Sequence, residues 1–142
     1  MISEYYIKHT EDLSRIKASG HQRLSNTQFD IYDMNSPSSM SYIYLLDMEI
    51  IGYLMSQVVL DEVHIHDIVV EKKFRNKGIG SAMISHLIDL AKHNNKSKVY
   101  LEVNSKNIIA IELYSKLGFV KSGIRNKYYN NIDDAILMDL WI

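Results

Sequence analysis

The chain has 142 residues, of which 46% are hydrophobic and 23% are charged, and its formal net charge at pH 7 is -1. This length and composition are typical of a single soluble domain, spanning residues 1–142, that can bury a core of its own. A nearly neutral chain lacks the basic balance of proteins that bind nucleic acid through its phosphates, so direct nucleic-acid binding is disfavoured. The absence of cysteine excludes disulfides, thiolate zinc ligands and a cysteine nucleophile.

The N-terminal sequence "MISEYYIKHTEDL" lacks the basic segment and the apolar segment of a signal peptide. No apolar run approaches the length needed to cross a bilayer. We therefore expect a cytoplasmic protein with no membrane partner.

The first forty residues predict a strand followed by helical segments. "EYYIKH" at 4–9 is typical of a strand, and "TEDLSRIKASG" predicts a short helix with Thr10 as its N-cap and Gly20 at its end. Residues 22–33 are ambiguous and are read as a second short helix. The loop "MNSPSSMS" at 34–41 contains the only proline and connects these segments to the rest of the domain.

The central part of the chain predicts three strands and then an amphipathic helix. Tyr42–Leu46 and Ile50–Val58 form a β-hairpin with a tight turn between them, and "EVHIHDIVV" at 62–70 is a further strand. After Gly78, apolar residues recur at helical spacing up to the polar run "KHNNKSK". This stretch therefore predicts a strand, a basic glycine loop and a helix that begins at the glycines.

The C-terminal part predicts a strand, a helix and a second hairpin. "KVYLEV" at 98–103 is a short buried strand, and the following helix has Asn107 as its N-cap and Gly118 just beyond its end. The tail predicts two strands around the turn "NNIDD". The order of the elements indicates an α+β domain built on a mixed sheet.

The loop "RNKGIG" suits an anion. Amides at a helix N-terminus attract negative charge, glycines let phosphate oxygens approach closely, and Arg75 and Lys77 add positive charge. The P-loop spacing is absent, and the Rossmann G-x-G-x-x-G pattern fails because Ser81, Ala82 and Met83 follow Gly80. From the loop alone, a phosphate cradle and a turn that merely needs glycine remain equally open.

Two other residues admit both a chemical and a structural interpretation. Glu102 interrupts an apolar strand, which suits a general base but also an outward-facing side chain on a half-exposed strand. Tyr114 occupies a core-facing helical position, where it could deliver a proton or simply pack. His64 and His66 share a strand face, but without a third ligand at matching spacing they do not predict a zinc site.

Taken in order, these stretches resemble the GNAT superfamily of N-acetyltransferases. "VVEKKFRNKGIGSAMISHLIDLA" is similar to its acetyl-coenzyme A motif R/Q-x-x-G-x-G/A, and "NIIAIELYSKLGF" is similar to its N-x-x-A-x-x-x-Y-x-x-x-G-F segment. Within the superfamily, "LEVNSKNIIAIELYSKLGFVKSGIRNKYYNNIDDAILM" resembles the ribosomal-protein-alanine N-acetyltransferases. The resemblance implies a mixed sheet splayed at its centre and flanked by about four helices.

The resemblance also implies roles for individual residues. Glu102 would be the general base and Tyr114 the acid facing the coenzyme sulfur. Acetyl-CoA would be the co-substrate, with no metal, and a backbone amide would polarise the thioester carbonyl. The coenzyme-binding residues would be Ile68, Val69, Val70, Arg75, Asn76, Lys77, Gly78, Ile79, Gly80, Ser81 and Asn107, and the substrate side would include Tyr128, Tyr129 and Asp134.

The implied function is transfer of an acetyl group from acetyl-CoA to the N-terminal alanine of a ribosomal protein. Two alternatives stay open: a GNAT enzyme for a small amine such as a polyamine or an aminoglycoside, and a non-catalytic acyl-CoA-binding module. The sequence departs from the family pattern in "RLSNTQFDIYDMN", in Lys106 where a small residue is usual, and in Asp133 where glutamate is usual. The first departure affects the expected wall of the substrate site.

Overall fold

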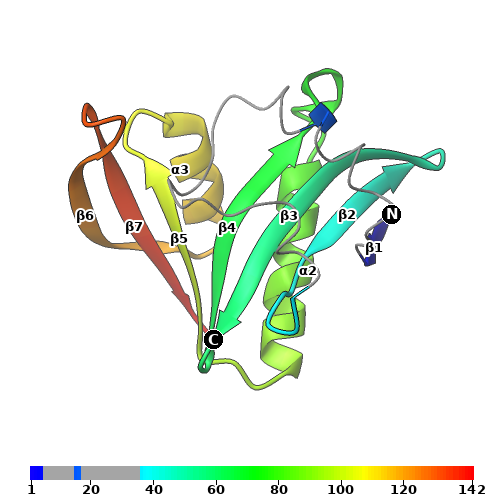
Figure 1. Ribbon diagram of the computed structural model, residues 1–142, viewed down its shortest axis with the longest axis horizontal. Helices are drawn as coiled ribbons and strands as arrows, with labels where there is room; N and C mark the ends of the chain where they lie inside the picture. The colour runs from blue at the N-terminus through cyan, green and yellow to red at the C-terminus, as the bar shows by residue number, and fades with distance from the viewer. Residues whose placement is uncertain (5–14, 17–35) are drawn as a thin grey trace.

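The computed structural model describes residues 1–4, 15–16 and 36–142, which contain one seven-stranded sheet in the order β1-β2-β3-β4-β5-β7-β6 (Figure 1). Every neighbouring pair is antiparallel except β4 and β5, which run parallel, so the predicted mixed sheet and α+β class are confirmed. The strands are β1 (Ile2–Glu4), β2 (Tyr42–Leu46), β3 (Glu49–Val59), β4 (Glu62–Val70), β5 (Lys98–Asn104), β6 (Val120–Tyr129) and β7 (Asp133–Trp141). The helical elements are η3 (Lys72–Phe74, a 3-10 helix), α2 (Ile79–His93) and α3 (Ile108–Lys116).

The tight turns lie where the sequence predicts them. Asp47 and Met48 join β2 to β3 with φ of 49° and 68°, the left-handed backbone that a two-residue hairpin turn requires. At the other hairpin, Asn130 and Asn131 have φ of 51° and 57°, and asparagine tolerates this region better than most residues. The predicted strands from residue 42 onward agree with the observed ones to within a residue or two.

The described residues contain two α-helices, fewer than the four or so that were predicted. The two helical segments predicted between residues 10 and 33 lie outside the described residues, apart from Arg15 and Ile16, which are helical. Most of the predicted first strand, 4–9, also lies outside the described residues, within which β1 covers Ile2–Glu4.

Both helices pack on one face of the sheet. α2 buries its apolar stripe, including Met83, Ile84 and Leu87, against the central strands, and α3 contributes Tyr114 to the same core. A second cluster on the opposite face includes Tyr53 and Val69. The sheet is therefore covered by apolar contacts on both faces near its centre, as expected for a mixed sheet with a parallel pair.

The sheet opens between β4 and β5. The two strands pair only where Glu62–Ile65 face Lys98–Leu101, and both continue beyond that point without pairing. Figure 1 shows them meeting near the C-terminus and diverging toward their far ends. The predicted splay is thus present, and it lies at the carboxyl ends of the two strands.

A bulge in β4 accompanies the splay. Ser56 pairs with Ile65 and Met55 pairs with Asp67, so His66 is an extra residue in β4. An extra residue reverses which face the following side chains point to. Ile65 accordingly packs in the core under α2, whereas Val69 packs in the cluster on the opposite face.

Candidate active site

The loop between β4 and α2 is held by its own backbone and by Arg75. Arg75 Nε donates to the carbonyl oxygen of Val70 at 2.8 Å, and the amide of Phe74 donates to the carbonyl of Glu71 at 2.8 Å. Gly78 then adopts φ of 80° immediately before the first residue of α2. Arg75 therefore ties the loop to the end of β4 and fixes where α2 begins.

Six consecutive amides in this loop are available to a ligand. No backbone or side-chain acceptor in the described residues pairs with the N–H groups of residues 76–81, whereas the amide of Ala82 already donates to the carbonyl of Gly78 at 3.0 Å. The first amides of a helix lack intrahelical partners, and the helix dipole places about half a positive charge there. The loop is therefore built to bind an anion such as phosphate.

Glycine suits positions 78 and 80 of the loop for different physical reasons. Gly78 needs its positive φ, which disfavours any other residue. Gly80 has no such φ, and a Cβ built on it would meet no protein atom within 4 Å. Nothing within the described chain requires glycine at position 80, so its absent side chain leaves space that a ligand can use.

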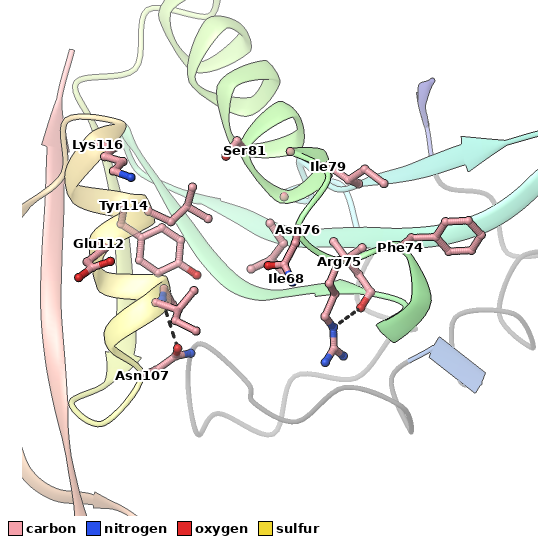
Figure 2. Close-up of a pocket in the computed structure, with 16 residues that line it drawn as sticks. Ile68, Phe74, Arg75, Asn76, Ile79, Ser81, Asn107, Glu112, Tyr114 and Lys116 are labelled. Atoms are coloured by element: carbon pink, nitrogen blue, oxygen red, sulfur yellow. Dashed lines mark hydrogen bonds between the residues drawn. The ribbon is translucent and has the colours of Figure 1, made fainter.

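An open cavity of about 450 Å³ lies between this loop, the end of β4 and α3. Figure 2 shows the Arg75–Asn76 loop on one side of it and Tyr114 of α3 on the other. Its lining is apolar along β4, mixes apolar residues with Glu112 and Lys116 along α3, and is polar at Arg75 and Asn76 of the loop, which suits an elongated ligand with a charged end. The lining residues are Ile68, Val70, Phe74, Arg75, Asn76, Gly78, Ile79, Gly80, Ser81, Asn107, Ile109, Ala110, Glu112, Leu113, Tyr114 and Lys116.

The second wall of this cavity is α3, and its ends form as predicted. The Asn107 side chain accepts a hydrogen bond from the amide of Ala110 at 3.2 Å, and Gly118 follows the helix with φ of 102°. Tyr114 is 2% exposed and packs edge-on against Phe119. These contacts hold the tyrosine ring in one orientation at the cavity wall.

Burial raises the pKa of Tyr114, and the charges of Asp67 and Tyr129 raise it further. Within the described part of the chain, its hydroxyl makes no hydrogen bond. The Tyr114 hydroxyl is therefore protonated and can donate a hydrogen bond to a ligand at the gap between β4 and β5. It lies close enough to Asp67 and Tyr129 for their charges to raise its pKa.

Glu102 approaches the splay from the other face of the sheet. Its strand neighbours Leu101 and Val103 belong to the core under α2, so the Glu102 side chain points the opposite way. Glu102 is only 5% exposed, which removes the interpretation of an outward-facing residue. It borders a second cavity of about 350 Å³ together with Tyr100, Arg125 and Tyr128.

The remaining predicted residues divide between the two cavities and the surrounding structure. Val69 lies on the β4 face opposite the first cavity, since the bulge at His66 reverses the strand, and Lys77 lies outside the lining with its Nζ 5.7 Å from the Phe74 ring. Tyr128 lines the second cavity, and Tyr129 is buried beside it. Asp134 instead accepts a hydrogen bond from the amide of Lys127 at 2.8 Å.

The two single-residue departures from the family pattern contact each other. Lys106 Nζ lies 2.7 Å from Asp133 Oδ1, and Asn104 Nδ2 donates to Asp133 Oδ2 at 3.0 Å. The hydrogen bond from Lys106 is the main cause that lowers the pKa of Asp133. This pair joins the loop before α3 to the β6–β7 hairpin, so the two changes form one local contact.

Sequence reasoning missed Tyr100 and Arg125, both of which bind Glu102. The contact of Tyr100 with Glu102 could have been predicted, because residues two apart on a strand share a face. The contact of Arg125 with Glu102 could not have been predicted, because the position of Arg125 depends on how β6 and β7 pair. Among the described residues no three His, Cys, Asp or Glu side chains form a group that could hold a metal ion, and no helix there is long and apolar enough to cross a membrane.

A sheet splayed between parallel strands, with an anion-binding loop on one strand and a buried carboxylate on the other, defines a class of acyl-transfer protein. The acetyltransferase (GNAT) family model matches residues 6–119, and the chain belongs to this family. Over 92 residues it is 39% identical to the [ribosomal protein bS18]-alanine N-acetyltransferase of Escherichia coli K12. That alignment covers 63% of this chain and 62% of the relative, so it spans somewhat less than two thirds of the relative's length.

Solved structures agree with this assignment. The crystal structure of the ribosomal-protein-S18-alanine N-acetyltransferase from Escherichia coli superposes with a TM-score of 0.90 at 27% identity, over 100% of this chain and 93% of that one. A Bacillus anthracis protein solved in complex with acetyl coenzyme A matches with a TM-score of 0.74 at 31% identity, over 82% and 70% of the two chains.

Proposed function

We propose that this protein transfers an acetyl group from acetyl-CoA to the N-terminal α-amine of a ribosomal protein beginning with alanine, by direct attack within a ternary complex. The observation that carries the proposal is that Tyr114 and Glu102 reach the gap between β4 and β5 from opposite faces of the sheet. A donor and an acceptor bound on the two faces would meet at that gap. The names of the Escherichia coli relatives support the choice of acceptor.

The residues of the first cavity fit the coenzyme. The free amides of residues 76–81 and the side chain of Arg75 would hold the pyrophosphate, and Ile68 and Val70 would lie along the pantetheine arm. The open space over Gly80 is where phosphate oxygens would approach the backbone. When bound, acetyl-CoA supplies an acetyl group activated as a thioester.

Glu102 would act as the general base on the acceptor amine. The nitrogen forms a bond to the acetyl carbon as the carbon–sulfur bond breaks, and the amine proton passes to Glu102 directly or through water. An α-amine has a pKa of about 7.7–8.0, against about 10.4 for a lysine side chain, a difference of roughly 3 kcal/mol in the work of deprotonation. A single carboxylate is therefore better suited to an N-terminal amine than to lysine.

Tyr114 would return a proton to the departing sulfur. A thiol has an ordinary pKa of about 8.5 and a tyrosine one of about 10, so proton transfer from tyrosine to the thiolate is uphill, and the thiolate can also take its proton from water. Burial of Tyr114 raises its pKa and makes it a weaker acid still, although it guarantees that the proton is present. Its contribution should therefore be smaller than that of Glu102.

The Tyr114→Phe variant is expected to lower kcat by about tenfold with little change in the KM for either substrate. Because the pKa of Tyr114 is raised above its ordinary value of about 10, Tyr114 stays protonated, and wild-type kcat should not fall between about pH 8 and about pH 10. Steady-state rates across this range test both statements. An alkaline fall centred below about pH 10 that disappears in Tyr114→Phe would contradict the proposed state of the tyrosine.

The acceptor is tested by competition between peptides and small amines. The purified protein is incubated with acetyl-CoA and either a peptide beginning Ala-Arg-Tyr or a panel of polyamines and aminoglycosides, and products are identified by mass. The proposal expects acetylation of the peptide at its α-amine. Acetylation of small amines alone would favour the small-amine alternative, and no transfer with retained coenzyme binding would favour a binding module.

A further inference from the structure

The carboxylate of Glu102 is bonded asymmetrically. Oε1 accepts a hydrogen bond from the Tyr100 hydroxyl at 2.5 Å and lies 3.2 Å from Arg125 Nη2. Oε2 is shielded from solvent and has no hydrogen-bond partner among the described residues. A buried polar atom without a partner costs about 1–3 kcal/mol, so an arrangement that keeps one oxygen unpaired calls for a functional reason.

Tyr100 holds Oε1 from within the same strand. Residues 100 and 102 share a face of β5, and His64 of the paired strand β4 packs its ring 4.9 Å from the Tyr100 ring. Burial raises the pKa of Tyr100, and its hydrogen bond to Glu102 raises it further. The hydroxyl therefore remains a donor to the carboxylate throughout the neutral range.

Arg125 reaches the same oxygen from two strands away. Arg125 pairs with Ala135 and Ala135 pairs with Asn104, so these three residues and Glu102 lie on one face of the β5–β7–β6 sheet. The small side chain of Ala135 leaves room for the arginine to extend toward Glu102. The guanidinium also lies 5.2 Å from the Tyr128 ring and remains 53% exposed.

We infer that Tyr100 and Arg125 are positioning residues that hold Glu102 by Oε1 and keep Oε2 as the atom that accepts the proton of the acceptor amine. The inference rests on the proposed function, because it assigns a purpose to the base of that reaction. Arg125 compensates the negative charge of a carboxylate that is almost fully buried, and Tyr100 fixes its rotation. A base held within a few tenths of an ångström of its working geometry reacts faster than one that samples several rotamers.

Kinetics of single and double variants test this assignment. Tyr100→Phe and Arg125→Gln should each lower kcat by about five- to tenfold, the equivalent of one ordinary hydrogen bond, with the KM for the peptide little changed. Arg125→Lys, which keeps the charge but loses the planar fork, should recover part of the Arg125→Gln loss. In a Glu102→Gln background, Tyr100→Phe should change kcat by less than roughly twofold, because the base that it positions is gone.

Matched controls separate positioning from folding. Tyr44→Phe removes a hydroxyl from β2, and Lys121→Gln removes a charge from the exposed part of β6; both should retain wild-type kcat. Thermal unfolding of every variant shows whether a loss of activity follows a loss of structure. Arg125 is half exposed, so its variants should fold even if Tyr100→Phe does not.

The outcomes distinguish this inference from the proposed function. A wild-type protein that transfers no acetyl group, or a Glu102→Gln variant as active as wild type, would overturn the proposed function itself. If Glu102→Gln is slow but Tyr100→Phe and Arg125→Gln act like wild type, only the inference fails. It also fails if Tyr100→Phe lowers kcat by the same factor with and without Glu102, or if both variants change the peptide KM alone.

Discussion

Glu102→Gln is expected to lower kcat by about 10²- to 10³-fold while affinity for coenzyme A stays at the wild-type value. Glutamine keeps the shape of the side chain and can still accept the hydrogen bond of Tyr100, but it cannot take a proton at neutral pH. The coenzyme cavity lies on the opposite face of the sheet, so its residues should be undisturbed. Steady-state kinetics with the Ala-Arg-Tyr peptide and calorimetric titration with coenzyme A measure the two quantities separately.

Asp89→Asn provides a control for this variant. Asp89 is an exposed carboxylate on α2 that lines neither cavity, so its replacement should leave both the base and the coenzyme site intact. A Glu102→Gln protein with wild-type kcat would show that Glu102 is not the base and would favour a non-catalytic acyl-CoA-binding module. Loss of coenzyme affinity in the same variant would show that the two faces of the sheet are not independent.

Gly80→Val is expected to abolish coenzyme binding without unfolding the protein. A side chain at position 80 would enter the space over the free loop amides, where nothing in the protein opposes it but phosphate oxygens would. Gly80→Ala should weaken binding less, and it should raise the free energy of unfolding by up to about 0.5–1 kcal/mol, because alanine restricts the unfolded chain more than glycine does. Calorimetric titration and thermal unfolding measure the two effects.

Two further variants serve as controls for Gly80→Val. Ala82→Val adds bulk to the same turn of α2 at an exposed position outside the cavity, and it should retain coenzyme binding. Gly78→Ala should reduce stability, because its φ of 80° strains any other residue. Wild-type affinity in Gly80→Val would mean that the loop is only a turn that needs glycine at position 78.

The elements from residue 42 onward could be predicted because their local signals agree with the final fold. The hairpin turns contain Asp47, Asn130 and Asn131, which accept positive φ, α2 has an apolar stripe at helical spacing, and α3 has both of its caps in the sequence. The glycine loop alone was undecided between a turn and a phosphate cradle. In the structure the two glycines differ: Gly78 supplies the positive φ of the turn, whereas Gly80 leaves open space beside the loop amides.

Long-range geometry could not be predicted. The bulge at His66 turns the side chain of Val69 away from the first cavity, and its position depends on pairing with β3, which no local pattern encodes. The contact between Arg125 and Glu102 depends in the same way on the register of β6 and β7. These features set the surroundings of Glu102, so the sequence could suggest Glu102 as a candidate base but could not predict its hydrogen bonds and ion pair.

The most direct test of the account is the intact mass of the ribosomal proteins from cells with and without the gene. One ribosomal protein whose mature N-terminus is alanine should be heavier by one acetyl group only when the gene is present, and a Glu102→Gln copy should not restore the modification. Identical masses in the two strains, or an acetyl group that maps to a lysine side chain, would contradict it.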